Sequence, residues 1–427
     1  MAAADHAPSF YAATANSRPA HPRLAGDATA DVCVVGAGFT GISAALHLAE
    51  RGYDVAVLEA ARLAWGASGR NGGQVCTGQR QDVFTLEKTA GSEAAKALWD
   101  MAEESKAFVA ERIARHEIDC DYRPGQVLAA TKAGHIGELA EEAAHLERHY
   151  GYDKYRMIAG DEIAGYVDSP TYVGGRYDAG AGHLHPLNYA LGLAAAAEAA
   201  GARFFEDSRV TGIDWTRRPV VRTAGGSVTA DHVLLCTNAY LDDLEPRIAP
   251  VIMPIGNYML ATAPLGENRA RALIGGSHCV CGTNFVVDHY RMSADHRLIY
   301  GGGETYTRRQ PTDLKAWTRR HMLDVFPQLD DAAIDYAWGG DIAVTLVRMP
   351  HFGRLGAAGF FAHGFCGQGV TIGPLAGKLL AEAVAGTAER FDVFARLPQR
   401  AFPGGTMLRR PAQVLGMLYY AMRDRVG

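Results

Sequence analysis

The pattern of apolar positions is clearest between residues 31 and 60, which read DVCVVGAGFTGISAALHLAERGYDVAVLEA. Residues 32–35 form an uninterrupted apolar run, which is typical of a short strand buried on both faces of a sheet. The apolar positions then follow helical spacing from Ile42 to Ala49, and a second apolar run occupies residues 55–58. The pattern therefore predicts a strand, a helix and a second buried strand in succession.

The turn between the first strand and the helix has the spacing G-x-G-x-x-G. Gly36 permits a tight turn, Gly38 permits a pyrophosphate to approach the backbone, and Gly41 permits the helix to lie close to the strand. Glu59 ends the second strand, where a carboxylate can bind ribose hydroxyls. An acid there disfavours a 2'-phosphate and so NADP, but the motif alone does not separate NAD from FAD.

The segment WGASGRNGGQ, residues 65–74, follows this unit where a plain dehydrogenase would continue into another helix. Four of its positions are glycines: Gly66, Gly69, Gly72 and Gly73. Backbone that lies flat along a planar ring and offers amides to its polar edge needs such bare residues. The loop therefore favours a flavin over a nicotinamide, and a mobile surface loop is the alternative.

A second glycine-rich loop precedes a helix at AHGFCGQGVTIGPLAGKLLAEAVAG, residues 362–386. Gly364, Gly367 and Gly369 lie in the loop, and apolar residues from Ile372 to Ala383 form a helical stripe. The unpaired amides at the start of a helix make this a candidate site for an anion or a dipole. A glycine-rich turn before a packed helix is the structural alternative.

Composition narrows the class of protein. The chain has 427 residues, 48% hydrophobic and 21% charged, so two interlocked domains of an ordinary globular protein are expected. A net charge of −5 without a basic stripe excludes a nucleic-acid partner. The longest apolar run, residues 190–201, contains a glutamate and is too short to cross a bilayer, and the N-terminus does not have the pattern of a secretory signal.

The seven cysteines show neither C-x-x-C nor zinc-finger spacing. This predicts reduced thiols in a cytoplasmic protein, with no metal site. No second G-x-G-x-x-G occurs on a strand–helix unit, which excludes a separate nicotinamide domain and favours oxygen or an electron carrier as the redox partner.

Taken together, these motifs resemble the D-amino-acid-oxidase superfamily of FAD enzymes. The segment WGASGRNGGQ is most similar to its gamma-glutamylputrescine oxidase branch, with Ala64 where that branch usually has glycine. The segments SFYAATA, AGHLHPLNYALGLA, NFVVDHYRMSADHRLIYGGG, FPGGTMLRRP and MLYYAMRDR add to the resemblance. It covers nearly the whole chain, although its FAD motifs are more specific than its substrate assignment.

The resemblance implies a mixed α/β fold, with a Rossmann-type FAD-binding domain and an interleaved substrate domain on a large antiparallel sheet. We assign residues 25–90, 150–240 and 335–390 to the FAD-binding domain. Residues 91–149 and 241–334 are assigned to the substrate domain, and residues 391–427 to a C-terminal helical tail. Further expectations are strands joined by a Gly225-Gly226 turn, a hairpin at residues 293–295, and a helix at residues 93–116 outside the substrate sheet.

The resemblance also implies which residues contact FAD. They lie in the first glycine turn, after the second strand, in the 65–74 loop, at two later strand ends and in the 364–369 loop with the helix that follows. The assigned positions are Gly36, Gly38, Phe39, Thr40, Gly41, Glu59, Ala60, Arg62, Gly66, Ala67, Ser68, Arg70, Asn71, Gly72, Gly73, Gln74, Val210, Thr237, Asn238, Gly367, Gln368, Gly369, Val370 and Thr371. The region VTLVRMPHFGRLG contains no cysteine that could hold the flavin, so FAD is expected to be non-covalent.

The chemistry implied by the resemblance is oxidation of a carbon beside a neutral amine, with flavin N5 accepting the hydride and O2 reoxidising the flavin to give H2O2. Side-chain candidates near the flavin are His185, Tyr258, Arg291, His351 and Gln368, with histidine more common than Gln368 in this branch. Arg291 is expected to pair with Asp288 or Asp295, or to bind a substrate carboxylate.

Several functions remain open at this point. The substrate is gamma-glutamylputrescine or a similar amine, or alternatively a secondary or cyclic amino acid such as pipecolate, proline or sarcosine. A dehydrogenase that delivers electrons to a quinone or an electron-transfer protein is a third hypothesis, since residues 407–425 are amphipathic and basic. A non-catalytic FAD-binding protein is the fourth, and it leaves the substrate domain without a purpose.

Overall fold

The strand–turn–helix–strand unit predicted at residues 31–60 forms the centre of an eight-stranded sheet. The computed structural model describes residues 5–284, 287–305 and 310–406. Strand β1 (Ala28–Val35) pairs in parallel with β2 (Val55–Leu58), and α2 (Phe39–Ala49) connects them. The main path of the sheet is β16-β17-β10-β1-β2-β7, and β9 pairs with both β10 and β8. The added strands are β7 (Arg203–Phe205), β8 (Val210–Asp214), β9 (Val220–Thr223), β10 (Gly226–Leu235), β16 (His351–Leu355) and β17 (Gly359–His363).

Two further helices pack on α2. Helices α6 (Pro186–Ala199) and α9 (Gly369–Val384) both contact α2, and the three helices share one apolar core. The approach of α9 is very close, because a Cβ atom at Gly377 would lie 2.3 Å from the carbonyl oxygen of Thr40. A larger residue at Gly377 would therefore separate the two helices.

A second, nine-stranded sheet follows the order β15-β11-β14-β13-β12-β4-β6-β3, with β5 paired to β6. Its strands are antiparallel except for the parallel pair β4 and β12, so the expected large antiparallel sheet is in fact mixed. The predicted α/β fold class is confirmed. The strands are β3 (Gln74–Val75), β4 (Arg123–Ala130), β5 (Tyr155–Ile158), β6 (Gly174–His183), β11 (Met253–Thr262), β12 (Cys279–Gly282), β13 (His289–Met292), β14 (Leu298–Thr305) and β15 (Ile334–Val344).

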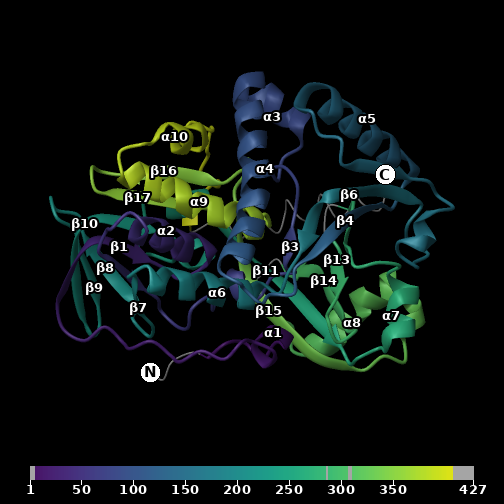
Figure 1. Cartoon of the computed structure of the whole chain (residues 1–427), viewed down its shortest axis with the longest axis horizontal. Coiled ribbons are helices and arrows are strands. Elements are labelled where there is room, and N and C mark those ends of the chain that lie inside the picture. The colour runs from purple at the N-terminus through teal and green to yellow at the C-terminus, as the bar shows by residue number, and fades with distance from the viewer. Residues whose placement is uncertain (1–4, 285–286, 306–309, 407–427) are drawn as a thin grey trace.

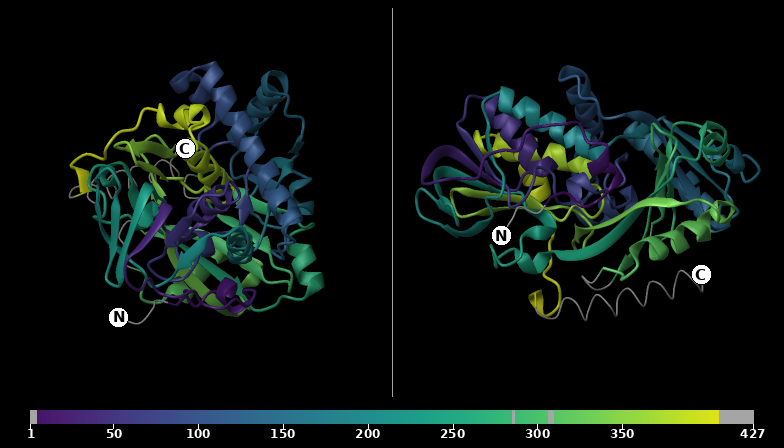
Figure 2. Two further views of the ribbon diagram at one scale, coloured as in Figure 1. Left: turned by 60° about the vertical axis from the view of Figure 1, so that its left-hand side comes forward. Right: turned by 90° about the horizontal axis from the view of Figure 1, so that it is seen from below.

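Figures 1 and 2 show the two sheets toward opposite ends of the long axis, with α4 (Ser92–Arg115) standing between them in Figure 1. The predicted helix at residues 93–116 is α4, but its neighbours are α9, α3 and α10 rather than the outside of the substrate sheet. It packs there because its apolar residues belong to the same core as α2 and α9. The remaining helices are α1 (Phe10–Ala13), α3 (Val83–Ala90), α5 (Ala133–Tyr150), α7 (Glu267–Leu273), α8 (Leu314–Val325) and α10 (Glu389–Ala395).

The two sheets interleave along the chain differently from the boundaries that we predicted. Strands β5 and β6, within residues 150–240, and β15, within residues 335–390, belong to the nine-stranded sheet rather than to the sheet around β1. The hairpins are as expected, with β9 and β10 joined at Gly225 and with β13 and β14 joined across residues 293–297. Of the predicted C-terminal tail, residues 407–427 lie outside the described residues.

His185, one of the predicted catalytic candidates, has a structural place at the start of α6. Its Nδ1 accepts a hydrogen bond from the amide of Asn188 at 3.1 Å, and its Nε2 lies 3.0 Å from the Thr14 hydroxyl oxygen. The side chain is only 7% exposed, and burial lowers its pKa to about 3. His185 is therefore a neutral helix cap that closes α6 against α1.

We predict that His185→Asn makes the protein less sensitive to acid. In the native protein His185 stays neutral, whereas in the unfolded chain it takes up a proton below its ordinary pKa of 6.5. Its contribution to stability is thus complete above pH 6.5 and is lost as the pH falls from 6.5 toward 3. Asparagine keeps the helix cap without titrating. Between pH 6.5 and 5 the variant should lose about 2 kcal/mol less unfolding free energy than the wild type.

Urea unfolding at pH 7, 6 and 5 measures this difference. His149→Asn, an exposed histidine on α5, serves as the matched control and should follow the wild-type curve. A pH dependence in His185→Asn equal to that of the wild type would contradict the assignment of His185 as a buried neutral cap.

Candidate functional site

The first glycine turn, residues 36–41, is shaped by close contacts of the protein with itself. Gly36 has φ +100°, and a Cβ atom there would lie 2.9 Å from the carbonyl oxygen of Cys236. A Cβ atom at Gly41 would lie only 1.9 Å from the carbonyl oxygen of Gly36. The turn therefore presses α2 against the end of β1, and the first-turn amides of the helix are directed at the end of the sheet. This geometry suits the binding of a phosphate.

Glu59 and Ser68 lie next to this turn. The Glu59 carboxylate accepts hydrogen bonds from the amides of Ala37 at 2.8 Å and Ala61 at 3.0 Å. Burial raises the pKa of Glu59, while these hydrogen bonds act in the opposite direction. The Ser68 hydroxyl accepts from the amide of Phe39 at 2.9 Å, which links the 65–74 loop to the start of α2. A carboxylate, helix amides and a hydroxyl thus meet at one point.

Other assigned contacts surround the same end of the sheet. The amide of Ser208 donates to the Glu59 carbonyl at 2.7 Å, and β8 begins two residues later at Val210. Arg62 forms ion pairs with Glu206 at 3.4 Å and Asp207 at 3.3 Å, so its charge is already balanced by protein carboxylates. Ala60 lies between Glu59 and the Ala61 amide that Glu59 accepts.

Glycine is required in the 65–74 loop for a different reason from the one that the sequence suggested. A Cβ atom at Gly66 would meet the Tyr240 ring at 2.8 Å, and one at Gly72 would meet the His289 ring at 2.6 Å. At Gly73, which has φ +77°, it would lie 2.0 Å from the Leu184 carbonyl oxygen. The loop is bare because the protein's own atoms crowd each glycine. It offers its opposite surface to the cavity described below.

Polar side chains hold this loop in shape. The Asn71 Oδ1 accepts from the amide of Gly73 at 2.7 Å, while its Nδ2 donates to the carbonyls of Ala67 and Ser68. Arg70 donates to the Gly339 carbonyl at 2.9 Å and lies over the Trp65 ring, 4.1 Å from its centroid. Both side chains are therefore used for internal contacts, which makes the loop rigid.

Hydrogen bonds join the 364–369 loop to the end of β10, and join α9 to the segment that follows the 65–74 loop. The Asn238 Oδ1, which follows Thr237 at the end of β10, accepts from the amide of Gly364 at 2.9 Å. The Thr371 hydroxyl accepts from the amide of Cys76 at 2.9 Å. Residues predicted from three distant parts of the sequence therefore meet at one place.

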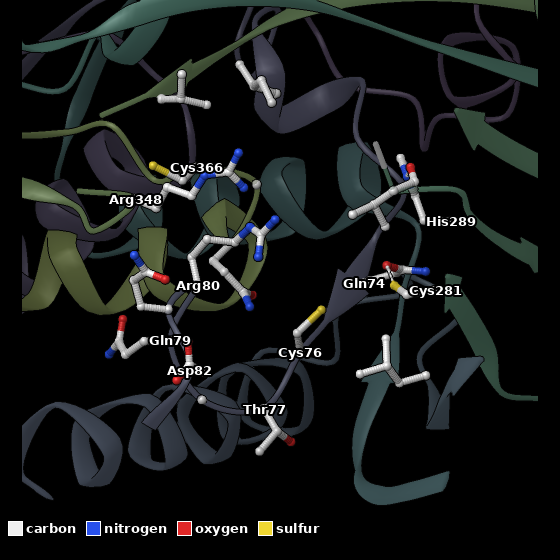
Figure 3. A pocket seen from close by; sticks show the side chains of 18 of the residues that line it. Gln74, Cys76, Thr77, Gln79, Arg80, Asp82, Cys281, His289, Arg348 and Cys366 are labelled. Carbon is white, nitrogen blue, oxygen red and sulfur yellow. Dashed lines mark hydrogen bonds between the residues drawn. The ribbon is translucent and has the colours of Figure 1, made fainter. Parts of the chain in front are cut away.

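A cavity of about 950 Å³ opens between these loops and the nine-stranded sheet. Figure 3 shows part of its lining, with Gln74, Cys76 and Arg80 projecting from β3 and the segment after it, His289 from β13 and Cys366 from the 364–369 loop. Further lining residues from the two loops and the sheet are Ala67, Arg70, Asn71, Gly72, Gly73, Gln126, Leu128, Asn257, Gly367, Gln368 and Val370.

The cavity and the turn together fit an FAD molecule. The turn supplies the nucleotide elements, and the cavity is large enough for a planar ring with a substrate beside it. The Oε1 atom of Gln368 is buried and accepts no hydrogen bond within the described residues. A buried acceptor of this kind calls for a donor, which a bound ring with an N–H group would supply.

Of the five side-chain candidates, only Gln368 is among the described residues that line the cavity. The Tyr258 hydroxyl lies 2.8 Å from the Thr305 hydroxyl. His351 lies in β16, with its Nδ1 2.9 Å from Nε2 of His363. Tyr258 and His351, like His185, are thus held in protein contacts away from the cavity lining.

Arg291 lies behind the 65–74 loop rather than in the cavity. It is 1% exposed, and its Nε donates to the Gly72 carbonyl at 3.0 Å. The expected ion pair is wrong, because Asp288 accepts from the Tyr300 hydroxyl and Asp295 pairs with Arg297 at 2.6 Å. Arg291 therefore acts as a buried support for the loop.

Sequence reasoning missed His289, which lines the cavity two positions before Arg291 on β13. Alternate residues of a strand share a face, and both side chains approach Gly72. The His289 Nδ1 donates weakly to the Val287 carbonyl at 3.4 Å, and burial lowers the pKa of the imidazole. The spacing of two residues between His289 and Arg291 was the signal in the sequence that could have revealed His289 as a lining residue.

The described residues contain no cluster of three or more side chains suited to a metal ion. No helix within the same residues has the length and apolarity needed to span a membrane.

Comparison with known proteins agrees with this site. The family model described as FAD dependent oxidoreductase matches residues 31–383. Gamma-glutamylputrescine oxidoreductase of Escherichia coli is 46% identical over 424 residues, which are 99% of each chain. A probable oxidoreductase, OrdL, of Haemophilus influenzae is 38% identical over 99% of this chain and 98% of its own.

Solved structures show the same fold at lower identity. Glycine oxidase from Geobacillus kaustophilus superposes with a TM-score of 0.71 at 22% identity, over 84% of this chain and 95% of that one. L-proline dehydrogenase from P. horikoshii gives 0.69 at 20% identity, over 88% and 96%. Because the family model covers most of the chain, this protein belongs to the FAD dependent oxidoreductase family and is an enzyme of that class.

Proposed function

We propose that this enzyme oxidises the terminal amine of gamma-glutamylputrescine or a closely similar compound. The observation that carries the proposal is the 46% identity to gamma-glutamylputrescine oxidoreductase across both whole chains. The net reaction converts R–CH2–NH2, O2 and H2O to R–CHO, NH3 and H2O2, with an imine as the product before hydrolysis. When bound, FAD supplies the two-electron acceptor for this chemistry.

The residues that would hold FAD are those gathered at the turn and the two loops. The helix amides after Gly38 would bind its phosphates, and Glu59 is placed to bind a ribose hydroxyl. The backbone of Gly72 and Gly73 and the Gln368 amide line the cavity that would receive the ring. We expect non-covalent binding, because the segment VTLVRMPHFGRLG before the 364–369 loop contains no cysteine that could hold the flavin.

The cavity offers a neutral group to an amine. The His289 imidazole is neutral at pH 7, since burial lowers its pKa. With its Nδ1 directed at the Val287 carbonyl, its Nε2 is left to accept a hydrogen bond. We propose that His289 helps to orient the substrate amine in its neutral form, which is the form that can be oxidised.

The alternative of a cyclic or secondary amino acid needs a cation next to the reacting carbon to hold the carboxylate. Arg291 was the candidate for that cation, and it lies behind Gly72 instead of in the cavity. This placement favours an amine whose charged end is remote from the flavin. We also propose a cytoplasmic location, since all seven cysteines are free thiols.

We predict that the purified holoenzyme forms peroxide with gamma-glutamylputrescine and much less with pipecolate, proline or sarcosine. Peroxide release under air is measured for each compound, with flavin bleaching under nitrogen as a second signal. Turnover of a cyclic amino acid alone would overturn the proposed substrate. Bleaching without peroxide would keep the substrate but replace O2 by another acceptor.

We predict that all the flavin leaves the protein on denaturation. Precipitation with acid should leave a colourless pellet and a yellow supernatant, because no covalent bond is expected. Yellow colour that stays with the washed pellet would contradict this prediction.

We predict that Gly72→Val prevents the retention of flavin. The added side chain would meet the His289 ring and displace either that ring or the loop. Gly212→Val is the matched control, because a Cβ atom at Gly212 meets nothing within 4 Å and β-branched residues suit a strand. The flavin-to-protein absorbance ratio after gel filtration should fall sharply only for Gly72→Val, and circular dichroism should show that both variants fold. Full flavin content in Gly72→Val would count against placing the ring at this loop.

A further inference from the structure

Arg80 projects into the cavity from the segment that follows the 65–74 loop (Figure 3). Its neighbours in sequence are both anchored: the Gln79 Nε2 donates to the Leu98 carbonyl at 2.8 Å, and the Gln81 Nε2 donates to the Val347 carbonyl at 3.1 Å. Arg80 itself forms no hydrogen bond or ion pair with any residue in the described part of the chain. The backbone is thus held firmly while the guanidinium group faces the cavity without a protein acceptor.

A second arginine reaches the cavity from the end of β15. Arg348 follows Val347, the residue whose carbonyl anchors Gln81, and its backbone has φ +52°. This left-handed conformation is uncommon for a residue other than glycine, and it marks positions that the surrounding structure imposes. Figure 3 shows Arg348 beside Cys366 and Arg80 extending from the segment that contains Gln79 and Asp82, with both side chains directed into the cavity.

The positive charges of Arg80 and Arg348 both act on the Cys366 thiol. Burial raises the pKa of the Cys366 thiol, and the positive charges of Arg80 and Arg348 both work against that increase. Arg80 has the same influence on Cys76 and Cys281, which also line the cavity. A positive potential therefore extends from the arginines into the space between the two glycine loops.

Five carboxylates line the cavity among the described residues, and three of them, Asp82, Glu142 and Asp178, are bound to other protein groups. Asp82 accepts from the amide and the hydroxyl of Thr85, both at 2.8 Å, and thereby caps α3. Glu142 pairs with Arg176 at 2.8 Å. Asp178 accepts from the Tyr152 hydroxyl at 2.5 Å, and Glu138 is exposed on α5. Neither these four acids nor Asp341, the fifth, forms a hydrogen bond or ion pair with Arg80, so an anion from outside the protein would be attracted there.

We propose that Arg80 and Arg348 form a subsite that binds the carboxylate at the far end of the amine substrate. The inference rests on the proposed function, and it adds the reason for substrate choice. A planar guanidinium group suits a carboxylate through paired, charge-assisted hydrogen bonds. An amine that carries a remote carboxylate, such as a gamma-glutamyl amide, would be held at both ends. A free diamine would lose this contact and would be repelled by the arginines.

Binding of a ligand that cannot be oxidised tests the subsite directly. Gamma-glutamylbutylamide keeps the carboxylate and lacks the terminal amine, and calorimetry with the FAD-loaded enzyme gives its Kd. We expect Arg80→Gln and Arg348→Gln each to weaken binding about 10- to 100-fold, as for the loss of a charge-assisted hydrogen bond. Arg80→Lys keeps the charge and should lose less. Arg217→Gln, an exposed arginine on the β8–β9 connection, is the matched control and should bind like the wild type.

Turnover then separates this inference from the proposed function. In Arg80→Gln, kcat/KM should fall about 10- to 100-fold for gamma-glutamylputrescine and stay within about twofold for N-acetylputrescine, which has no carboxylate. Equal losses for both substrates, or an unchanged Kd for the amide, would overturn the subsite. If the wild type binds the amide through Arg80 yet does not oxidise gamma-glutamylputrescine, the subsite stands and the proposed function fails. If the wild type does not bind the amide, the subsite is wrong whatever the enzyme oxidises.

Discussion

The contact between α2 and α9 is the constraint on which the cavity depends. Each helix begins at a glycine-rich loop, and Gly377 allows the backbones to approach until only a hydrogen atom fits between them. The distance between the helices therefore sets the distance between the 36–41 turn and the 364–369 loop. The hydrogen bond from the Cys76 amide to Thr371 then joins the 65–74 loop to the same helix. Packing that is local to two helices thus positions elements that are far apart in the chain.

This dependence explains how much the sequence could predict. The unit at residues 31–60 was predictable because its strand, turn and helix follow one another and each has a local signal. The assignment of β5, β6 and β15 to the second sheet was not, since strand pairing depends on partners far along the chain. The α/β class followed from the motifs, whereas the course of the sheets needed the structure.

The same distinction applies to the site. The glycines in the sequence correctly indicated the loops. The reason why glycine is needed there could not be read from the sequence, because Tyr240, His289 and the Leu184 carbonyl approach from other elements. The candidates His185, Tyr258 and His351 had the right residue types for chemistry, yet protein partners satisfy their polar atoms. Residue type indicates what a side chain can do, and only its neighbours decide whether it is available.

Two residues of strand β13, His289 and Arg291, have different roles although they lie close together. His289 and Arg291 lie on one face of the strand, and both approach Gly72. The histidine reaches the cavity, whereas the arginine ends at the Gly72 carbonyl and the Tyr11 hydroxyl, where no substrate can follow. A charge held there supports the loop but cannot hold a carboxylate beside the flavin. Any carboxylate on the substrate must then be recognised elsewhere in the cavity, which makes remote arginines the natural place for specificity in this enzyme.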